Sequence, residues 1–224
     1  MNALVKTPDG AGAVAPLAEL DLYRVFAVCF GQPSGERYSW LSGKEFRRLL
    51  KHLAGELKDG AEAGAARRFP SYSEYEAAYL ALFEVGVPAP PVPLLESAHS
   101  RRAVPQEIVL ECVNFYEVLG LRSSGSAYPP DHLLTQLEFL AAVRYLRESK
   151  TNTEEVATLV RLEADFLERH LLNWLPAARK KLSKFDPPMF LPLLSLLCEH
   201  IRREHEVLQG QVPARAISTD ASKH

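Results

Sequence analysis

Asp131, His132 and Glu138 are the residues of this chain whose types and spacing could do chemistry together. On a helix, the seven-residue interval from Asp131 to Glu138 would align their carboxylates on one stripe, with His132 on the neighbouring stripe. Carboxylates bind arginine and lysine through charge-assisted hydrogen bonds, and histidine titrates near neutral pH. The group therefore predicts either a site for a basic peptide or a helical enzyme in which His132 works with Asp131 or Glu138.

A purely structural role suits the same residues: Asp131 would cap a helix, His132 would pack, and Glu138 would be solvated. Before them, segment 121–127 is small and polar, and the prolines after Tyr128, including Pro130, stiffen the approach to a helix start. A mobile loop ending beside two carboxylates favours the peptide site, but spacing alone leaves both interpretations open.

Other sequence signatures of catalysis or metal binding are absent. The chain has no G-x-x-x-x-G-K-[ST] and no G-x-G-x-x-G pattern. Its Glu-x-x-His pair, Glu96 to His99, stands alone where a di-iron bundle needs two. His200 and His205 are five residues apart, which separates them around a helix. We therefore expect no metal, no cofactor and no catalytic residues.

The composition predicts a cytoplasmic protein that neither binds nucleic acid nor inserts stably into a membrane. The 224 residues are 47% hydrophobic and carry a formal net charge of -2, so there is no basic field for a polyanion. No apolar run approaches the roughly 20 residues that span a bilayer, and no export signal is evident. The three cysteines, at positions 29, 112 and 198, lie far apart among apolar neighbours, as expected for reduced, packed thiols.

Apolar residues repeat at intervals of three and four along most of the chain, which predicts an all-α protein. We expect one compact domain over 17–209 with seven or eight helices, between flexible tails at 1–16 and 210–224. It should be a monomer, although a swapped dimer is an alternative. The expected helices are 17–30, 42–58, 71–83, 105–119, 132–145, 151–175, 177–184 and 190–209.

Particular residues indicate where several helices begin and end. Ser42 and Ser71 each precede a glutamate by three positions, which is the pattern of a capping box. Pro105 suits a first helical turn, and Asp131 is placed to cap the helix that carries Glu138. Pro176 is expected to close the helix before it.

Five motifs, in order along the chain, resemble the TorD/DmsD/NarJ family of chaperones that mature molybdenum enzymes. The fourth along the chain is the P-D-H-x-x-x-E-[LF]-x-[FM] box, with Gln136 at its acidic position. The others are Y-x-x-L-F, E-S after a proline-rich stretch, F-Y-x-x-x-G-L, and H-L-x-x-W. The matching segments are 130–139, 79–83, 96–97, 115–121 and 170–174.

The resemblance implies a TorD-like all-helical fold and a non-catalytic role. Such a chaperone binds the N-terminal or leader segment of the apo catalytic subunit of a molybdopterin-containing oxidoreductase. It holds this client until the cofactor is inserted and the subunit is assembled or exported. Asp131 and His132 carry over from the family's box as residues of the leader-binding groove. To them we add Tyr128, Pro130, Glu138 and Glu96.

A twin-arginine leader is basic and then apolar, so carboxylates beside exposed aromatic side chains would suit both of its halves. A generic helical adaptor for other proteins is the alternative to the chaperone.

Overall fold

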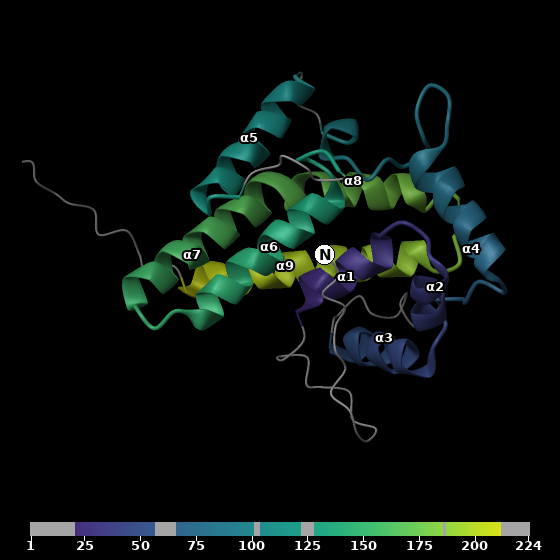
Figure 1. Ribbon diagram of the computed structural model, residues 1–224, viewed down its shortest axis with the longest axis horizontal. Helices are drawn as coiled ribbons and strands as arrows, with labels where there is room; N and C mark the ends of the chain where they lie inside the picture. The colour runs from purple at the N-terminus through teal and green to yellow at the C-terminus, as the bar shows by residue number, and fades with distance from the viewer. Residues whose placement is uncertain (1–20, 57–65, 101–103, 122–127, 186, 212–224) are drawn as a thin grey trace, which may run out of the picture.

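The computed structural model describes residues 21–56, 66–100, 104–121, 128–185 and 187–211, and this part of the chain is helical (Figure 1). It contains no β-strand beyond an isolated antiparallel bridge between Leu95 and His132, so the all-α prediction is confirmed. The α-helices are α1 (Leu22–Phe30), α2 (Gly35–Leu41), α3 (Lys44–Glu56), α4 (Tyr72–Tyr79), α5 (Pro105–Val118), α6 (Leu133–Ser149), α7 (Thr153–Phe166), α8 (Leu172–Leu182) and α9 (Phe190–Gln211).

Three shorter helical turns join this set: the π-helical turns η3 (Leu80–Glu84) and η5 (Leu167–Leu171), and the 3₁₀ turn η4 (Glu96–Ala98). Because α7, η5 and α8 follow one another without a break, they can be counted as one helix. The described residues then contain eight helices, within the expected seven or eight.

The core lies around α6, which packs against α1 on one side and α7 on another. The last helix, α9, packs against α1, α7 and α8. Figure 1 shows α5 along one side of this central group and α3 on the opposite side. No described helix combines the length and the apolar character needed to cross a membrane.

Aromatic side chains on α4 and η3 belong to the core, as their helical spacing predicts. Tyr75, Tyr79 and Phe83 are buried and surround Phe190 of α9, with ring centroids 5.1–6.0 Å from its ring. The capping residue Ser71 is also confirmed, since its hydroxyl accepts from the backbone N–H of Glu74 at 3.2 Å.

The beginning of the chain departs from the expected helix boundaries. Asp21 caps the first described helix, which starts at Leu22, whereas the expected start at position 17 lies outside the described residues. Ser42 ends the unexpected helix α2, and the following helix begins at Lys44. With seven residues, α2 is too short to display a helical period in the sequence, which is why it was missed. The expected end of α3, at 58, lies outside the described residues.

Pro176 lies inside α8 and does not end a helix, so this expectation was wrong. Proline leaves the carbonyl four residues earlier without its helical donor. Here the π-helical turn η5 has already changed the local hydrogen-bond pattern. Nδ2 of Asn173 donates to the carbonyls of Glu168 and Arg169, at 2.8 and 2.9 Å. The helix continues through Pro176 to Leu182, and α9 later extends to Gln211, beyond the expected limit at 209.

Candidate functional site

The segment that begins at Tyr128 is held against η4 by a short pair of extended chains. The backbone N–H of Leu133 donates to the carbonyl of Leu94 at 2.8 Å, and that of Glu96 donates to the carbonyl of Asp131 at 3.0 Å. Oδ2 of Asp131 accepts from the backbone N–H of Ser97 at 3.1 Å. Asp131, which is 2% exposed, therefore satisfies a donor of η4 and does not cap α6 as expected.

His132 takes the capping position instead. Its Nδ1 accepts from the backbone N–H of Leu134 at 3.2 Å, and its ring stacks on Tyr128 with the centroids 4.3 Å apart. Burial lowers the pKa of His132 to about 4, although the carboxylate of Asp131 opposes this shift. The imidazole is therefore neutral at pH 7, and its Nδ1 is engaged in the cap, which leaves it poorly suited to acid-base catalysis.

Two hydroxyl groups fix the prolines between Tyr128 and His132. The Tyr116 hydroxyl of α5 donates to the carbonyl of Pro130 at 2.5 Å, and Oγ1 of Thr135 donates to the carbonyl of Pro129 at 3.0 Å. Contacts from η4, α5 and α6 thus hold segment 128–132. Most of segment 121–127, expected to be a mobile loop, lies outside the described residues, since only Leu121 is described.

Glu96 lies beneath this segment, 1% exposed, at the centre of a buried polar cluster. Its Oε2 accepts from Nε2 of Gln136 at 2.6 Å and lies 2.9 Å from Nδ1 of His170. This contact is a hydrogen bond from histidine to glutamate in the tautomer of His170 whose Nδ1 carries the proton. Oε1 of Gln136 in turn accepts from Nε1 of Trp174 at 3.1 Å. The cluster therefore links η4 to α6, η5 and α8.

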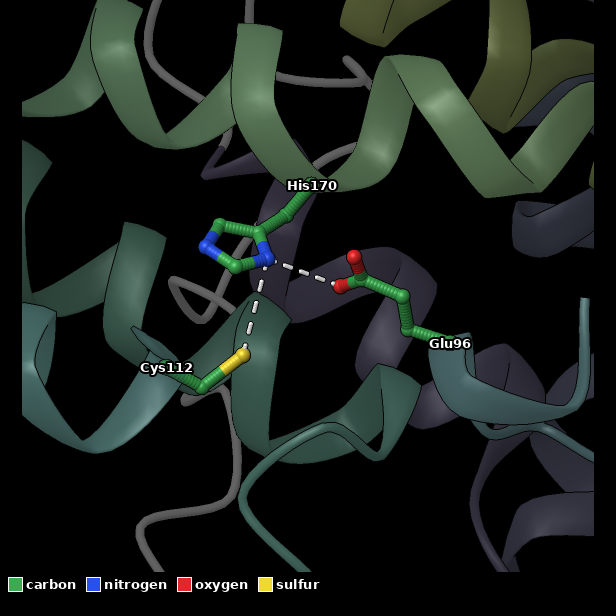
Figure 2. A group of neighbouring side chains, drawn as sticks. All are labelled: Glu96, Cys112 and His170. Carbon is green, nitrogen blue, oxygen red and sulfur yellow. Dashed lines mark hydrogen bonds and ion pairs between the residues drawn. The ribbon is translucent and has the colours of Figure 1, made fainter. Parts of the chain in front are cut away.

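Cys112 completes the cluster, and Figure 2 shows Glu96, Cys112 and His170 converging from three separate elements. Its Sγ lies 3.6 Å from Nδ1 of His170, and the donor atoms of the three residues lie within 4.8 Å of one another, close enough to hold a metal ion. However, Nε2 of Gln136 points at both Glu96 and Cys112, at 2.6 and 3.8 Å.

The bond from Trp174 fixes the amide of Gln136 so that its N–H groups, and not its oxygen, face this space. A cation there would meet those N–H groups. Burial also raises the pKa of the Cys112 thiol to about 12, which disfavours the thiolate that metals bind. The arrangement is better explained as a packed hydrogen-bond cluster that supports segment 128–132 from below.

The remaining candidate residues lie at the surface. Tyr128 and Pro130 are half-buried, and Glu138 is exposed on α6. Burial raises the pKa of the Tyr128 phenol, and the carboxylates of Glu84 and Glu138 raise it further, against the opposing charge of Arg37. Partial desolvation likewise raises the pKa of Glu138. The ring of Tyr128 therefore lies at the surface, where the carboxylates of Glu84 and Glu138 act on it.

The structure thus divides the six candidate residues into two sets. Asp131, His132 and Glu96 are buried and hold the segment, whereas Tyr128, Pro130 and Glu138 reach the surface. The expected stripe of two carboxylates is not formed, because Asp131 precedes the helix and bonds to η4 while Glu138 is exposed.

Four supporting partners were not predicted as residues of the site: Ser97, Gln136, His170 and Trp174. A signal for the last two was available, because residues four apart share a helix face and the H-L-x-x-W motif contains both.

The comparisons with known proteins agree with the motifs. The family model described as "Nitrate reductase delta subunit" matches residues 44–179, which include the whole candidate site. The perchlorate reductase assembly chaperone of Dechloromonas aromatica (strain RCB) is 28% identical over 191 residues, 80% of this chain and 85% of its own. The selenate reductase assembly chaperone of Thauera selenatis is 29% identical, over 83% of each chain.

A solved structure of a redox enzyme maturation protein from Archaeoglobus fulgidus aligns over 90% of this chain and 99% of its own, with a TM-score of 0.44 and 16% identity. The expected non-catalytic role is confirmed by the relatives, which are named as assembly chaperones and not as enzymes. The resemblance to the TorD/DmsD/NarJ chaperones is confirmed as well. This chain belongs to the nitrate reductase delta subunit family.

Proposed function

We propose that this protein is a cytoplasmic assembly chaperone for a molybdopterin-containing oxidoreductase. Its client is the apo catalytic subunit, whose N-terminal or leader segment it binds until the cofactor is inserted and the subunit is assembled or exported. The names of the relatives support an oxidoreductase client, since they are assembly chaperones of perchlorate and selenate reductases.

The observation that carries the peptide-binding part is the rigid support beneath Tyr128. The ring stacks on His132, while Asp131 and Glu96 anchor the neighbouring backbone and side chains in the interior. A fixed aromatic surface loses little conformational entropy on binding, so more of the contact energy is available for affinity. Asp131, His132 and Glu96 therefore act by positioning, whereas Tyr128, Pro130 and Glu138 contact the client.

The charges around Tyr128 favour a basic segment. Glu84 and Glu138 are both exposed and both act on the Tyr128 phenol, where the two carboxylates outnumber the one opposing guanidinium, that of Arg37. Arginine or lysine side chains of a leader would pair with these carboxylates, while the apolar residues that follow would pack on the tyrosine ring. Because the carboxylates are exposed, these ion pairs are individually weak, which suits a client that must be released.

Purification from the native cells tests the function. A tagged full-length chain should recover the catalytic subunit of a molybdopterin-containing oxidoreductase, identified by mass spectrometry and lacking its cofactor. Recovery of other proteins without such a subunit would favour the generic adaptor and reject the chaperone.

The surface is tested with a labelled peptide that carries the N-terminal segment of the recovered subunit. Tyr128→Ala should weaken its binding about tenfold, the usual scale for loss of an aromatic contact. Tyr145→Ala is the matched control, because Tyr145 is a 64% exposed tyrosine on α6, the helix that follows the candidate segment, and lies outside the candidate site. Equal affinities of the two variants would remove Tyr128 from the binding surface.

A further inference from the structure

The exposed side of α3, at the edge of the molecule in Figure 1, carries an unbroken row of positive charge. Lys44, Arg47, Arg48 and Lys51 are spaced by three, one and three residues, so their side chains lie on one face of the helix. All four residues are exposed. The opposite face of α3 is buried in the core through Phe46, Leu49, Leu50 and Leu53. The row therefore faces solvent along the first two turns of the helix.

Arg68 extends this row, and we call the five residues the α3 cationic face. A hollow of about 30 Å³ lies beside α3, and its lining includes both Arg47 and Arg68. None of the five side chains forms a hydrogen bond or an ion pair with another described residue. Exposure alone does not prevent pairing, because the Arg202 side chain of α9 is 46% exposed and pairs with Glu199 and Glu206.

Acidic residues do not neutralise this face, even when the undescribed residues are counted. Positions 44–68, which include the undescribed stretch 57–65, contain seven lysine or arginine residues and four aspartate or glutamate residues, a formal charge of +3. The other undescribed residues together carry a formal charge of +2. On α2, which packs against α3, the charges of Glu36 and Arg37 cancel. Because the whole chain has a net charge of -2, the positive charge is a local property of this side of the molecule.

Helix stability does not explain why the four cations of α3 share one face. Like charges four residues apart on a helix repel, and Lys44 with Arg48 and Arg47 with Lys51 are two such pairs. Lys44 is also the first residue of α3, where the helix dipole disfavours a positive charge. Uncharged polar residues at these positions would make α3 more stable. A negatively charged partner outside the chain would instead compensate the repulsion.

The composition of the exposed surface selects among negatively charged partners. The centre of a protein–protein interface is enriched in aromatic residues and depleted of lysine. None of the ten large hydrophobic residues exposed in the described part of the chain lies on α3 or next to Arg68. Proteins that bind single-stranded nucleic acid add exposed aromatic side chains on which bases stack, but α3 has no exposed phenylalanine, tyrosine or tryptophan. An anionic lipid surface needs only exposed lysine and arginine residues, without a groove or an apolar contact.

We propose that the α3 cationic face attaches this protein reversibly to the headgroups of an anionic lipid surface. The contact is electrostatic, so the chain adsorbs without insertion and is released as salt screens the charges. This inference goes beyond the proposed function and does not depend on the identity of the client. For a client that is exported, the attachment would bring the bound subunit to the membrane that it must cross.

Vesicle binding tests the attachment with the full-length chain alone. The probes are vesicles of phosphatidylcholine and vesicles in which about one third of the lipid is the anionic phosphatidylglycerol. The chain should sediment with the anionic vesicles at low salt and stay in solution with the neutral ones. The double variant Arg47→Gln, Lys51→Gln should bind at least tenfold more weakly, since each lysine or arginine near an anionic surface raises the affinity about fivefold. This difference should shrink as salt is added.

Two control variants separate the α3 cationic face from total charge and from folding. The variant Lys180→Gln, Lys184→Gln removes the same charge from two exposed lysines at the end of α8, and it should reduce binding much less. The variant Arg47→Lys, Lys51→Arg keeps both charges and should bind as well as the wild type. The glutamine variant of α3 should be at least as stable in urea as the wild type, because it removes a pair of like charges.

The proposal is wrong if the wild type stays in solution with the anionic vesicles at low salt, or if the α8 variant loses as much binding as the glutamine variant of α3. Equal losses in the charge-keeping variant and the glutamine variant would show that binding does not depend on these charges. Tighter binding to duplex DNA or to polyglutamate than to the vesicles at the same salt, lost in the glutamine variant, would assign the face to a nucleic acid or an acidic protein instead. Because no client is present, these results leave the proposed function untouched.

Discussion

Glu96 and Glu163 are both buried glutamates that tie helices together, but their surroundings differ. Glu96, beneath the candidate site, interacts with the amide of Gln136 and the imidazole of His170. Glu163 of α7, which is 0% exposed, accepts from the hydroxyl of Tyr23 at 2.9 Å and lies 3.3 Å from a guanidinium nitrogen of Arg147. Arg147 also reaches Glu204 of α9, at 3.6 Å.

The contrast shows that a nearby positive charge does not by itself keep a buried carboxylate ionised. Burial raises the pKa of Glu163 to about 7, even though Arg147 and Arg144 lower it, because removing the charge from water costs more than the two guanidinium groups return. Oε2 of Glu163 has no hydrogen bond among the described residues, so the contact with Arg147 is an ion pair without good hydrogen-bond geometry. By contrast, the two polar atoms that face Glu96, Nε2 of Gln136 and Nδ1 of His170, both lie within hydrogen-bond distance of its Oε2.

Among these variants, removal of the Glu96 carboxylate should reduce the free energy of unfolding the most. Glu96→Ala leaves the buried donors of Gln136 and His170 without their acceptor. We expect a loss of about 3–5 kcal/mol in the free energy of unfolding, the range for breaking a buried polar pair. Denaturation by urea, followed by circular dichroism, measures it.

Glu96→Gln is the matched control, since its amide oxygen can still accept from one of the two donors. It should lose clearly less stability than the alanine variant. If Glu96→Ala lowers the free energy of unfolding by less than about 1 kcal/mol, the cluster does not need Glu96. The cluster would then not support segment 128–132 as inferred.

Glu163 should make stability fall as the pH rises. Its pKa is about 7 in the folded protein against an ordinary 4.5, so between these values the folded state binds more protons than the unfolded state. The stabilisation is complete below pH 4.5 and is lost as the pH rises through 7. Glu163→Gln mimics the protonated side chain and lacks this dependence. The free energy of unfolding of the wild type, relative to Glu163→Gln, should therefore fall by on the order of 3 kcal/mol from pH 4.5 to 8.

Measuring the wild type against the glutamine variant cancels the other buried groups that titrate in this range. His99, His132 and His200 all have a pKa lowered by burial, and they change stability in the opposite direction. A difference that stays constant from pH 4.5 to 8 would mean that Glu163 is ionised throughout, with Arg147 outweighing burial.

Local patterns predicted the helices well where one face of a long segment is buried. The segments of α5 and α9 each carry a helical period with a proline near the start, and both helices form. The short helix α2 has no such period, and the continuation through Pro176 depends on a π-helical turn that leaves no simple signature. Periodicity reports burial along a helix, but it does not report how the backbone hydrogen bonds are arranged.

For the candidate site, the sequence indicated a segment but not the contacts that its side chains make. Asp131 was expected to cap α6 because aspartate is a good cap, and nothing nearby in the sequence reveals the competing donor at Ser97, 34 residues earlier. Glu96 was added to the residues expected to bind the client, yet the fold buries it against Gln136 and His170. Interactions between distant segments decide which polar residues face solvent, so spacing identifies the segment but not the role of each side chain.

Substitutions at His132 should have the smallest effect on the free energy of unfolding. They test the helix cap of the candidate site separately from the packing of the core. His132→Ala removes both the acceptor for Leu134 and the ring that stacks on Tyr128, whereas His132→Asn removes the ring but can keep the acceptor. Because both variants lose the stacking, their difference measures the cap alone. We expect the asparagine variant to be more stable by about 1 kcal/mol, the usual contribution of a helix N-cap.

The dependence on pH distinguishes this cap from a general effect of substitution. In the wild type the pKa of His132 is about 4 when folded and 6.5 ordinarily, so the stability gained from the neutral ring is complete above pH 6.5 and is lost as the pH falls through 4. A protonated Nδ1 cannot accept from the backbone N–H of Leu134, whereas the side-chain oxygen of asparagine remains an acceptor at every pH in this range. The wild type should therefore lose stability relative to His132→Asn between pH 6.5 and 4. A constant difference over that range would show that the imidazole does not cap α6.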